Sequence, residues 1–167
     1  MMKIEPSAEH KWLQKFVGEW TYESECPTEP GQPPMKFTGT ETGRAIGDLW
    51  IMCEGRGQMP DGTPASMYLT LGFDPARKAF VGSWIGSMMT HLWTYEGRLD
   101  DGRRILTLDT VGPAMCGEGT PDTSGKTARY QDVHEFRSDD HRVLTSRMQG
   151  EDGKWHQFME CHYYRKK

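Results

Sequence analysis

Long hydrophobic runs are missing from this sequence. Only 35% of its 167 residues are apolar, and no stretch approaches the roughly 20 apolar residues that a membrane-spanning helix needs. The first residues, MMKIEPSAEHK, also lack the apolar segment of a secretory signal peptide. We therefore predict no membrane span and a cytoplasmic location.

Positive charge is scarce as well. The chain has 20 Lys and Arg against 24 Asp and Glu, which gives a formal net charge of −4. Binding to nucleic acid needs clustered basic side chains that contact phosphates. The single basic run, Arg165-Lys166-Lys167, lies at the C-terminus, where a solvated end is expected. Nucleic acid is therefore excluded as a partner.

Spacings typical of metal sites are absent. The four cysteines are widely separated and form no CxxC pair, so we expect reduced thiols at Cys26, Cys53, Cys116 and Cys161. No HExxH pattern occurs among the six histidines, although a zinc site needs three or four converging ligands. The sequence predicts no metal and no cofactor.

One short helical segment is followed only by strand patterns. Ser7 is placed to cap a helix over residues 8–16, with Trp12, Leu13 and Phe16 on one side. Strands are expected from Phe16–Trp20 to about Cys26, over 35–47 and 49–58, four times within 67–109, and over 127–138, 141–150 and 154–165. Because no helical pattern follows residue 16, folds that alternate strands and helices are excluded.

Ten meandering strands with regular turn spacing are typical of a closed barrel, since closure removes exposed strand edges. We predict a single all-β domain over residues 1–167, a ten-stranded up-and-down antiparallel barrel with a short N-terminal helix capping one end. A barrel of this size leaves room inside for a small ligand.

The stretch from Met67 to Asp109 predicts its own register, because the turns between its strands fix which residues face each other. The expected pairs are Leu71 with Phe80, Met67 with Trp84, Trp84 with Trp93, Gly86 with His91, and Tyr95 with Leu108. One face then carries the large apolar side chains and points inward. It consists of Met67, Leu69, Leu71, Phe80, Trp84, His91, Trp93, Tyr95, Leu106 and Leu108.

In the last three strands, two-residue turns predict two opposite faces. One face holds Asp132, His134, Thr145, Arg147, Glu160 and His162. The other is more apolar and holds Gln131, Val133, Glu135, Leu144, Ser146, Met148, Trp155, Gln157, Met159, Cys161 and Tyr163. Hydrophobic residues prefer the interior, so we predict that the charged face is the outer one. A slip of one residue would reverse this assignment.

These registers together predict a cavity inside the barrel, mostly apolar with a few polar groups, as is usual for a small-molecule site. His91 and Gln157 would orient the ligand, and Gly82 and Gly86 would leave space opposite the large rings. A plain packed core is the alternative for the same side chains. The predicted lining is Met67, Trp84, His91, Trp93, Tyr95, Met148, Gln157 and Met159.

Four segments resemble a family of uncharacterised bacterial proteins with a lipocalin-like, calycin-type barrel. They are PGQPPMKFTGTETGRAIG, LGFDPARKAFVGSWIGSM, EGRLDDGR and DGKWHQFMECHYYRK, and the likeness covers about His10 to Arg165. The resemblance implies a ten-stranded barrel like those of lipocalins and fatty-acid-binding proteins, with an N-terminal helix over one end, and it supplies no function. This chain departs from the family pattern at Gly86, where an Asp is usual, so a role that relies on a carboxylate there does not carry over.

The pattern Gly18-x-Trp20 also resembles the opening motif of lipocalins, in which a Trp closes the base of the barrel and a late Arg packs over it. Arg165 is the matching residue in this chain. An indole under a guanidinium is a common packing arrangement. We predict that Trp20 and Arg165 close the barrel and have a structural role; a recognition surface is the alternative.

Three classes of function stay open. The leading prediction is a barrel without catalytic residues that binds a small apolar or amphipathic molecule. The second is an enzyme of isomerase, decarboxylase or hydrolase type that uses a cavity His with a carboxylate such as Glu135, by analogy with similar barrels. The third is a haem-binding barrel whose ligand is a late-strand histidine, His162 or His156.

Overall fold

The computed structural model describes residues 3–115 and 120–167, and its strands close into one barrel. After α1 (Ala8–Leu13) and the 3-10 turn η1 (Gln14–Phe16) come β1 (Gly18–Cys26), β2 (Met35–Ile46), β3 (Trp50–Gln58), β4 (Pro64–Asp74), β5 (Ala79–Gly86), β6 (Trp93–Leu99), β7 (Ile105–Pro113), β8 (Thr127–Ser138), β9 (His141–Gln149) and β10 (Trp155–Arg165). Every strand pairs antiparallel with its neighbours in sequence, and β1 pairs with β10. The predicted ten-stranded up-and-down barrel is confirmed.

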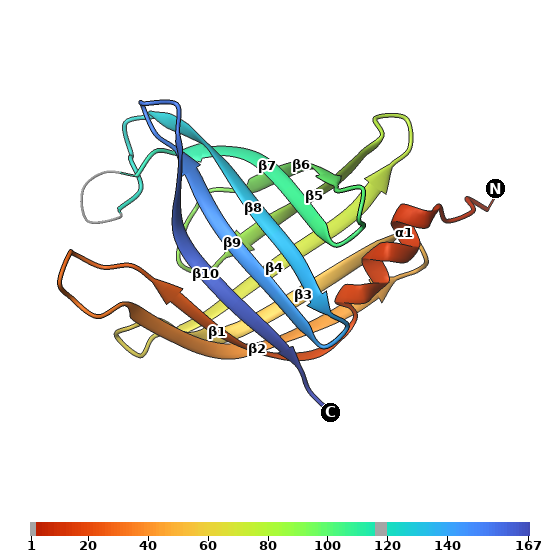
Figure 1. The fold of residues 1–167 in the computed structure, drawn as a ribbon, viewed down its shortest axis with the longest axis horizontal. Coiled ribbons are helices and arrows are strands. Elements are labelled where there is room, and N and C mark those ends of the chain that lie inside the picture. The colour runs from red at the N-terminus through yellow and green to blue at the C-terminus, as the bar shows by residue number, and fades with distance from the viewer. Residues whose placement is uncertain (1–2, 116–119) are drawn as a thin grey trace.

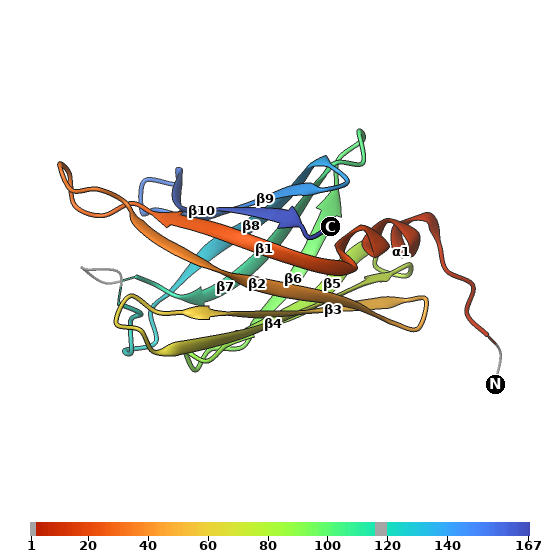
Figure 2. The same ribbon diagram turned by 90° about the horizontal axis from the view of Figure 1, so that it is seen from below.

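The two ends of the barrel differ. α1 lies across one end, the end at which the β2–β3 and β4–β5 turns also lie, as Figures 1 and 2 show. The loops β1–β2, β5–β6 and β9–β10 lie at the opposite end. We call this second end the mouth. Among residues 3–115 and 120–167, no helix combines the length and apolar character required to cross a membrane.

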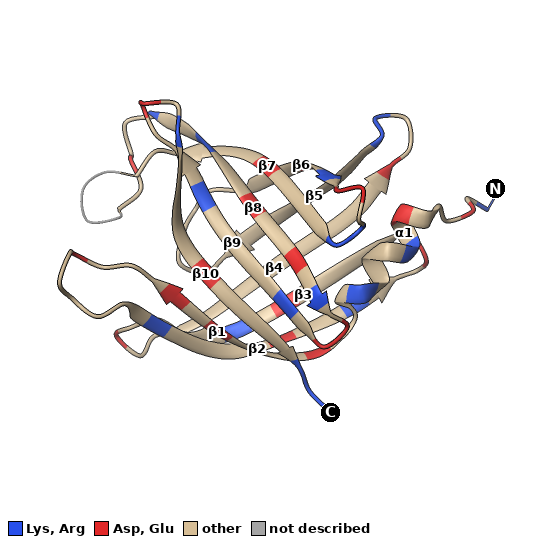
Figure 3. Cartoon of the chain, in the orientation of Figure 1, with Lys and Arg blue, Asp and Glu red and all other residues tan. Residues whose placement is uncertain are grey.

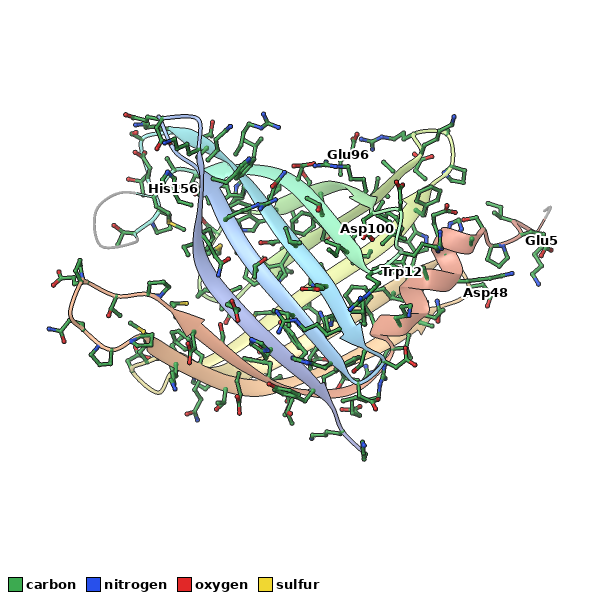
Figure 4. All side chains as sticks on the ribbon, viewed as in Figure 1. Glu5, Trp12, Asp48, Glu96, Asp100 and His156 are labelled. Atoms are coloured by element: carbon green, nitrogen blue, oxygen red, sulfur yellow. The ribbon has the colours of Figure 1, made fainter. Side chains whose placement is uncertain are left out.

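The end under α1 is filled with aromatic and aliphatic side chains. Leu13 and Phe16 are fully buried, and Trp12 is nearly so. The Trp12 indole N–H donates to the carbonyl of Arg103 at 2.8 Å, which ties the helix to the β6–β7 turn. Figure 4 shows Trp12 on the side of α1 that faces the barrel. This end is therefore closed by a packed plug.

The helix begins where the sequence predicts it. The Ser7 backbone N–H donates to His10 Nδ1 at 2.9 Å, so the His10 side chain satisfies a backbone group just before the helix. The other ring nitrogen of His10 lies 3.0 Å from the carbonyl of Phe73, at the end of β4. Because both nitrogens are engaged and the residue is buried, His10 fixes the start of α1 on the barrel.

The predicted inner face of the central stretch is correct for its strand residues, though not for His91, and two of its registers are displaced by two residues. Leu71 pairs with Gly82 rather than Phe80, and Leu108 pairs with Gly97 rather than Tyr95. A shift by two residues leaves every side chain on its original face. The pairing of Trp84 with Trp93 is confirmed.

Turn geometry accounts for the displaced registers. In the β4–β5 turn Lys78 adopts a positive φ of 52°, which extends β4 to Asp74 and moves the turn one residue along. In the β6–β7 turn Arg103 has φ 55°. There the Asp100 carboxylate accepts the backbone N–H groups of Arg104 and Ile105, each at 2.8 Å. A side chain that caps a turn in this way stabilises a longer turn than the two residues predicted.

The face predicted for β8 is wrong, and a β-bulge is the reason. β8 and β9 pair Ser138 with His141 as predicted, but the register then slips by one residue, so Phe136 rather than Arg137 faces Arg142. The residues of β9 therefore keep their predicted faces, whereas the two faces of β8 are exchanged. Asp132 and His134 therefore face the interior, and the outer side of β8 carries Gln131, Val133 and Glu135.

A second bulge lies in β10 between Gln157 and Met159. Beyond it, Met159, Cys161 and Tyr163 have the predicted inward register against β9. Before it, Gln157 pairs with Arg147 of the outer face and is exposed. Gln157 is thus placed outside the barrel, and so is Trp155, whose ring lies 5.6 Å from the Arg147 guanidinium.

Candidate functional site

The structure places six of the eight predicted cavity residues on the inner wall and separates the other two from it. Met67, Trp84, Trp93, Tyr95, Met148 and Met159 come from β4, β5, β6, β9 and β10 and share the interior face. Gln157 lies outside, as described above. His91 precedes β6 in the β5–β6 loop, where a ring nitrogen lies 3.1 Å from the carbonyl of Val111.

His91 is therefore a loop residue at the mouth. β5 pairs with β6 only as far as Trp84 with Trp93, and Gly86 pairs with Met67 instead. The connection between the strands is longer than the predicted two-residue turn, which moves His91 out of the strand. Its ring meets the edge of Trp93 with centroids 4.7 Å apart.

The two glycines expected to leave space are covered. A Cβ at Gly86 would collide with the Trp84 ring and the Met88 sulfur. A Cβ at Gly82 would collide with the carbonyl of Thr70. Gly86 does make room for a large ring, as predicted, but the ring of Trp84 itself occupies that room.

A void of about 30 Å³ lies in the middle of the barrel, between the plug and the mouth. A space of this size matches roughly one water molecule. Its wall is more polar than apolar, and it is lined by Tyr22, Glu41, Cys53, Gly55, Met67, Leu69, Trp84 and Tyr163. Two of the predicted cavity residues, Met67 and Trp84, are among them.

Arg142 is a charged residue of the interior and has no exposed surface. One of its terminal nitrogens donates to Glu41 Oε2, and the other lies 3.2 Å from His134 Nδ1. Burial by itself would lower the pKa of Arg142, but the charge of Glu41 raises it above its usual range. Arg142 therefore stays charged inside the barrel.

Aromatic rings enclose the Arg142 guanidinium. Its central carbon lies 3.9 Å from the centroid of Tyr163, 4.7 Å from that of Phe16 and 5.2 Å from that of Trp20. Contacts of a guanidinium with ring faces are attractive, and they are strongest where water is excluded. Arg142 thus belongs to the plug end, and Glu41 connects this layer with the void.

His134 stands beside this pair and stays neutral. Burial, with the charge of Arg142 as a second cause, holds the pKa of His134 well below its usual value. Its ring meets the edge of Phe16 with centroids 5.3 Å apart. As a neutral imidazole it accepts the Arg142 N–H at Nδ1.

A second polar group crosses the interior nearer the mouth. The Tyr95 hydroxyl donates to Asp132 Oδ2 at 2.5 Å, and the Ser146 hydroxyl donates to Asp132 Oδ1 at 2.6 Å. Burial raises the pKa of Asp132, while these two hydrogen bonds act in the opposite direction. The cross-link joins β6, β8 and β9, so Tyr95 serves as a structural donor here.

The thiols of the interior are poorly reactive. Cys53 and Cys161 are buried and, with Cys26, are free cysteines; Cys116 lies outside the described residues. Burial raises the pKa of Cys161 to about 12 and that of Cys53 well above its usual value. Since the thiolate is the nucleophile, neither thiol is activated for nucleophilic chemistry.

The charged residues of the site had a weak signal in the sequence. Glu41 lies in the polar run TGTETGR of β2, where apolar and polar residues do not alternate. Arg142 follows directly after the β8–β9 turn, a position typical of a solvated charge. Asp132 and His134 were recognised as a set, but on the outer face. A signal for the inward position is that His134 lies two residues before Phe136, and both then share a face with Tyr130.

The residues proposed for the alternative functions are not brought together inside the barrel. Glu135 lies on the outer side of β8, 3.6 Å from Arg137, whereas His91 is in the mouth loop. His162 also faces outward, where Nδ1 lies 2.9 Å from His141 and Nε2 lies 2.7 Å from Glu160. Acidic and basic positions alternate across β8, β9 and β10 in Figure 3.

His156 lies at the mouth, beside the β9–β10 turn, as its label in Figure 4 shows. A ring nitrogen is 3.2 Å from the Asp152 carboxylate, and the side chain is more than half exposed. Within residues 3–115 and 120–167, no three His, Cys, Asp or Glu side chains converge as a metal site would require.

A shallow groove of about 410 Å³ lies outside the barrel wall at the mouth. The loop Pro27–Pro34 forms one side and the start of β10 forms the other, including Gln157 and Met159. The groove is open to solvent, and its lining combines Glu25, Glu29 and Glu160 with prolines of the loop. It is wider and more open than the interior void.

Trp20 and Arg165 meet at the plug end. They face each other across β1 and β10, and the Arg165 guanidinium carbon lies 4.2 Å from the Trp20 ring centroid. The same guanidinium donates to the carbonyls of Val17 and Lys15 at 2.6 and 3.0 Å. The Trp20 indole N–H donates to the carbonyl of Phe16 at 3.0 Å. Arg165 therefore ties the last strand to the segment that enters the first.

Comparisons with known proteins agree with this architecture. The profile of DUF1579, described as a protein of unknown function, matches residues 5–165. No curated protein matches the sequence. The structure is similar to the crystal structure of Rv2717c from M. tuberculosis, with a TM-score of 0.60, 10% identity, and coverage of 98% of this chain and 100% of that one. At this identity the likeness shows the fold alone.

A redesigned β-barrel, mFAP0, solved with DFHBI bound, is also similar, with a TM-score of 0.48 and 12% identity. The similarity covers 91% of this chain and 100% of that one. It is weaker than the similarity to Rv2717c, and nothing about the function of this chain is drawn from it.

Proposed function

This chain belongs to the DUF1579 family, whose function is unknown, and from the geometry of its barrel we propose that the protein binds a small amphipathic molecule. The ligand reaches the interior through the mouth, and its polar group occupies the central void. The observation that carries this proposal is the divided wall of the void: Tyr22, Glu41 and Tyr163 come from the adjacent strands β1, β2 and β10, and Met67, Leu69 and Trp84 come from β4 and β5.

The divided wall supports an amphipathic ligand because each half matches one part of such a molecule. Small-molecule sites are mostly apolar, with a few polar groups that fix orientation. A plain hydrophobic core has no need for a carboxylate beside a space, since a buried charge is costly unless it is paired and hydrogen-bonded. Here the barrel keeps Glu41 at the void and supplies Arg142 as its counterion.

The void is smaller than a typical ligand, so the side chains around it must move. Met67 is the residue best suited to do so, because it is only partly buried and its unbranched thioether chain changes rotamer easily. Met148 and Met89 pack against the core near the mouth and are also partly buried. A ligand that displaces such chains gains a binding space without changing the barrel.

Access from the mouth is supported by the contrast between the two ends. Trp12, Leu13 and Phe16 close the end under α1. Toward the mouth, Met67, Trp84 and Met148 on the interior face are only partly buried, and Phe158 in the β10 bulge retains 37% of its surface. Its ring contacts Tyr130, with centroids 6.1 Å apart.

Binding of the fluorescent probe N-phenyl-1-naphthylamine, which carries no ionised group, tests the proposal, with quenching of tryptophan emission as a second readout. The variant Gly55→Leu fills the void, because a Cβ at this position points at Met67, whose terminal carbon would be 3.3 Å away. The variant Met67→Ala enlarges it. We expect Gly55→Leu to abolish the response and Met67→Ala to strengthen it. Gly86→Leu is less suitable, since it would strike the Trp84 ring.

Matched controls place the same changes on the outer face. Thr94→Leu adds a leucine to the exposed side of β6, and Ile85→Ala removes an apolar side chain that is 47% exposed. Both should leave the response unchanged. Equal binding by Gly55→Leu and the parent protein, with the variant still folded by circular dichroism, would show that the probe binds elsewhere and would refute the proposal.

A further inference from the structure

We infer that the polar group of the ligand is a hydrogen-bond donor, an alcohol or an amine, and that the Glu41 carboxylate accepts it. The inference rests on the proposed function and names the ligand class that the central void selects. Three observations carry it: the position of Glu41, the enclosure of Arg142, and the hydroxyl groups beside the carboxylate.

Glu41 is the only carboxylate among the described residues that line the void. It is nearly buried, with 6% of its surface exposed. Its Oε2 atom accepts from Arg142, and a carboxylate has further lone pairs on both oxygens. A donor placed in the void therefore meets an acceptor that already carries a negative charge, and such charge-assisted hydrogen bonds are stronger than neutral ones.

Arg142 does not offer its own charge to a ligand in the same way. It is completely buried and is not among the residues that line the void. The rings of Phe16, Trp20 and Tyr163 surround its guanidinium, and its terminal nitrogens face Glu41 and His134. A ligand carboxylate would thus approach Glu41 before it could reach a cation. Like charges at close range favour the donor ligand over the acid.

Tyr22 and Tyr163 complete the polar side of the void. Burial is the main cause that raises the pKa of both phenols, so each hydroxyl keeps its proton. A hydroxyl can donate and accept. A ligand alcohol can therefore donate to Glu41 and accept from a tyrosine, which a primary ammonium cannot do. An alcohol and an ammonium can both donate a hydrogen bond to the carboxylate, but only the alcohol can also accept one from a tyrosine hydroxyl.

Three probes that differ only in their polar group test the inference on the unaltered protein: 1-octanol, octylamine and octanoate. Each competes with N-phenyl-1-naphthylamine, and the concentration that halves the fluorescence of this probe is measured. We expect octanol and octylamine to compete at concentrations at least about tenfold lower than octanoate, a difference that corresponds to about 1.4 kcal/mol. If octanoate competes as well as the other two or better, the inference is wrong, and the proposed function stands. If none of the three competes, the proposed function fails with it.

A paired variant assigns the preference to Glu41. The double substitution Glu41→Gln with Arg142→Met removes both charges, and such replacement of a buried pair is tolerated in many proteins. We expect the preference over octanoate to fall below about threefold in this variant. The control Glu135→Gln with Arg137→Met removes an ion pair from the outer face of β8 and should keep the full preference. A preference that survives in the first variant overturns the assignment.

Discussion

Arg142 and Glu41 are two charges that the barrel holds away from water. Transfer of such a pair into the interior has a large desolvation cost, which their attraction offsets only when the geometry is good. In this barrel the pair joins β9 to β2, strands that lie on either side of β1 and β10. The pair therefore contributes to the relative placement of strands that are not neighbours.

The single variant Glu41→Gln is expected to destabilise the protein by about 3–5 kcal/mol, because it leaves Arg142 buried without its counterion. The double variant with Arg142→Met should recover most of this loss, since no charge remains to be desolvated. Chemical denaturation with urea measures both. Equal losses in the single and double variants would mean that the pair is not coupled in the way described.

Trp20 is fully buried beneath Arg165. Trp20→Ala is expected to cost about 3–5 kcal/mol, as for other truncations of buried aromatic residues. Trp155→Ala is the matched control, because Trp155 lies on the outer face and its removal should cost much less. A loss well under one kilocalorie for Trp20→Ala, measured by urea denaturation, would contradict the closing role of this residue.

His134 links stability to pH. Its pKa in the folded protein is depressed by burial and by Arg142, so near pH 6 the unfolded chain binds a proton that the folded chain does not. The contribution of His134 to the free energy of unfolding is then fully present above its unfolded pKa of about 6.5, and it is lost as the pH falls below that value. Asp132 acts in the opposite direction, because its pKa is raised in the folded protein. Its contribution to the free energy of unfolding is present at low pH and is lost as the pH rises above the pKa that Asp132 has in the unfolded chain.

The variant His134→Gln isolates this contribution. Below pH 6.5 the stability of the parent should fall more steeply than that of the variant, by at most about 1.4 kcal/mol per pH unit for one proton. His156→Gln, at an exposed position of the mouth, should keep the slope of the parent. Parallel curves of stability against pH for His134→Gln and the parent would contradict the assignment.

At the scale of single strands, the alternation of large and small side chains predicted the inner face correctly wherever the ladder was regular. β6 illustrates this, since Trp93, Tyr95 and Gly97 are buried and the residues between them are exposed. Register was less predictable, because it depends on turn conformation. Lys78 and Arg103 both adopt positive φ values. A glycine at these positions would have indicated such a conformation in the sequence, but Lys and Arg do not.

The candidate site was the least predictable part, and the two bulges explain why. A bulge adds one residue to one strand and reverses its faces from that point on. The bulge near Arg137 brought Asp132 and His134 inside, and the bulge near Phe158 moved Gln157 outside. Glu41 was missed for a different reason: β2 buries few apolar side chains, so polarity there does not distinguish its two faces.

The bulge in β8 has a testable role. Deletion of Arg137 removes the extra residue, makes Phe136 with Arg142 and Ser138 with His141 successive pairs of one ladder, and leaves the inner face of β8 unchanged. We therefore expect cooperative thermal unfolding, followed by circular dichroism, to persist. Deletion of Val133, inside the regular ladder, is the contrasting variant: it turns over one half of β8 relative to the other and should abolish the cooperative transition. Loss of cooperativity in the Arg137 deletion, or its survival in the Val133 deletion, would contradict this role.

At the scale of the molecule, closure depends on one pair of strands. Removal of β10, residues 155–167, would leave unpaired edges on β1 and β9, and exposed edges promote association. We expect such a chain to elute in size-exclusion chromatography as large assemblies. A chain that lacks only residues 166–167 should elute at the same volume as the parent protein. A monodisperse monomer without β10 would show that closure is not required.

The bond from Arg165 to the carbonyl of Val17 spans 148 positions of the chain, and this separation has a consequence for biosynthesis. At about 5–20 residues per second, a ribosome needs roughly 7 to 30 seconds to travel that distance. During this time β1 has emerged and has β2 on one side, while its other partner does not yet exist. The nascent barrel therefore grows as an open, curling sheet whose first edge waits for the last strand. That interval, and not the finished protein, is when a chaperone would find β1 free to bind.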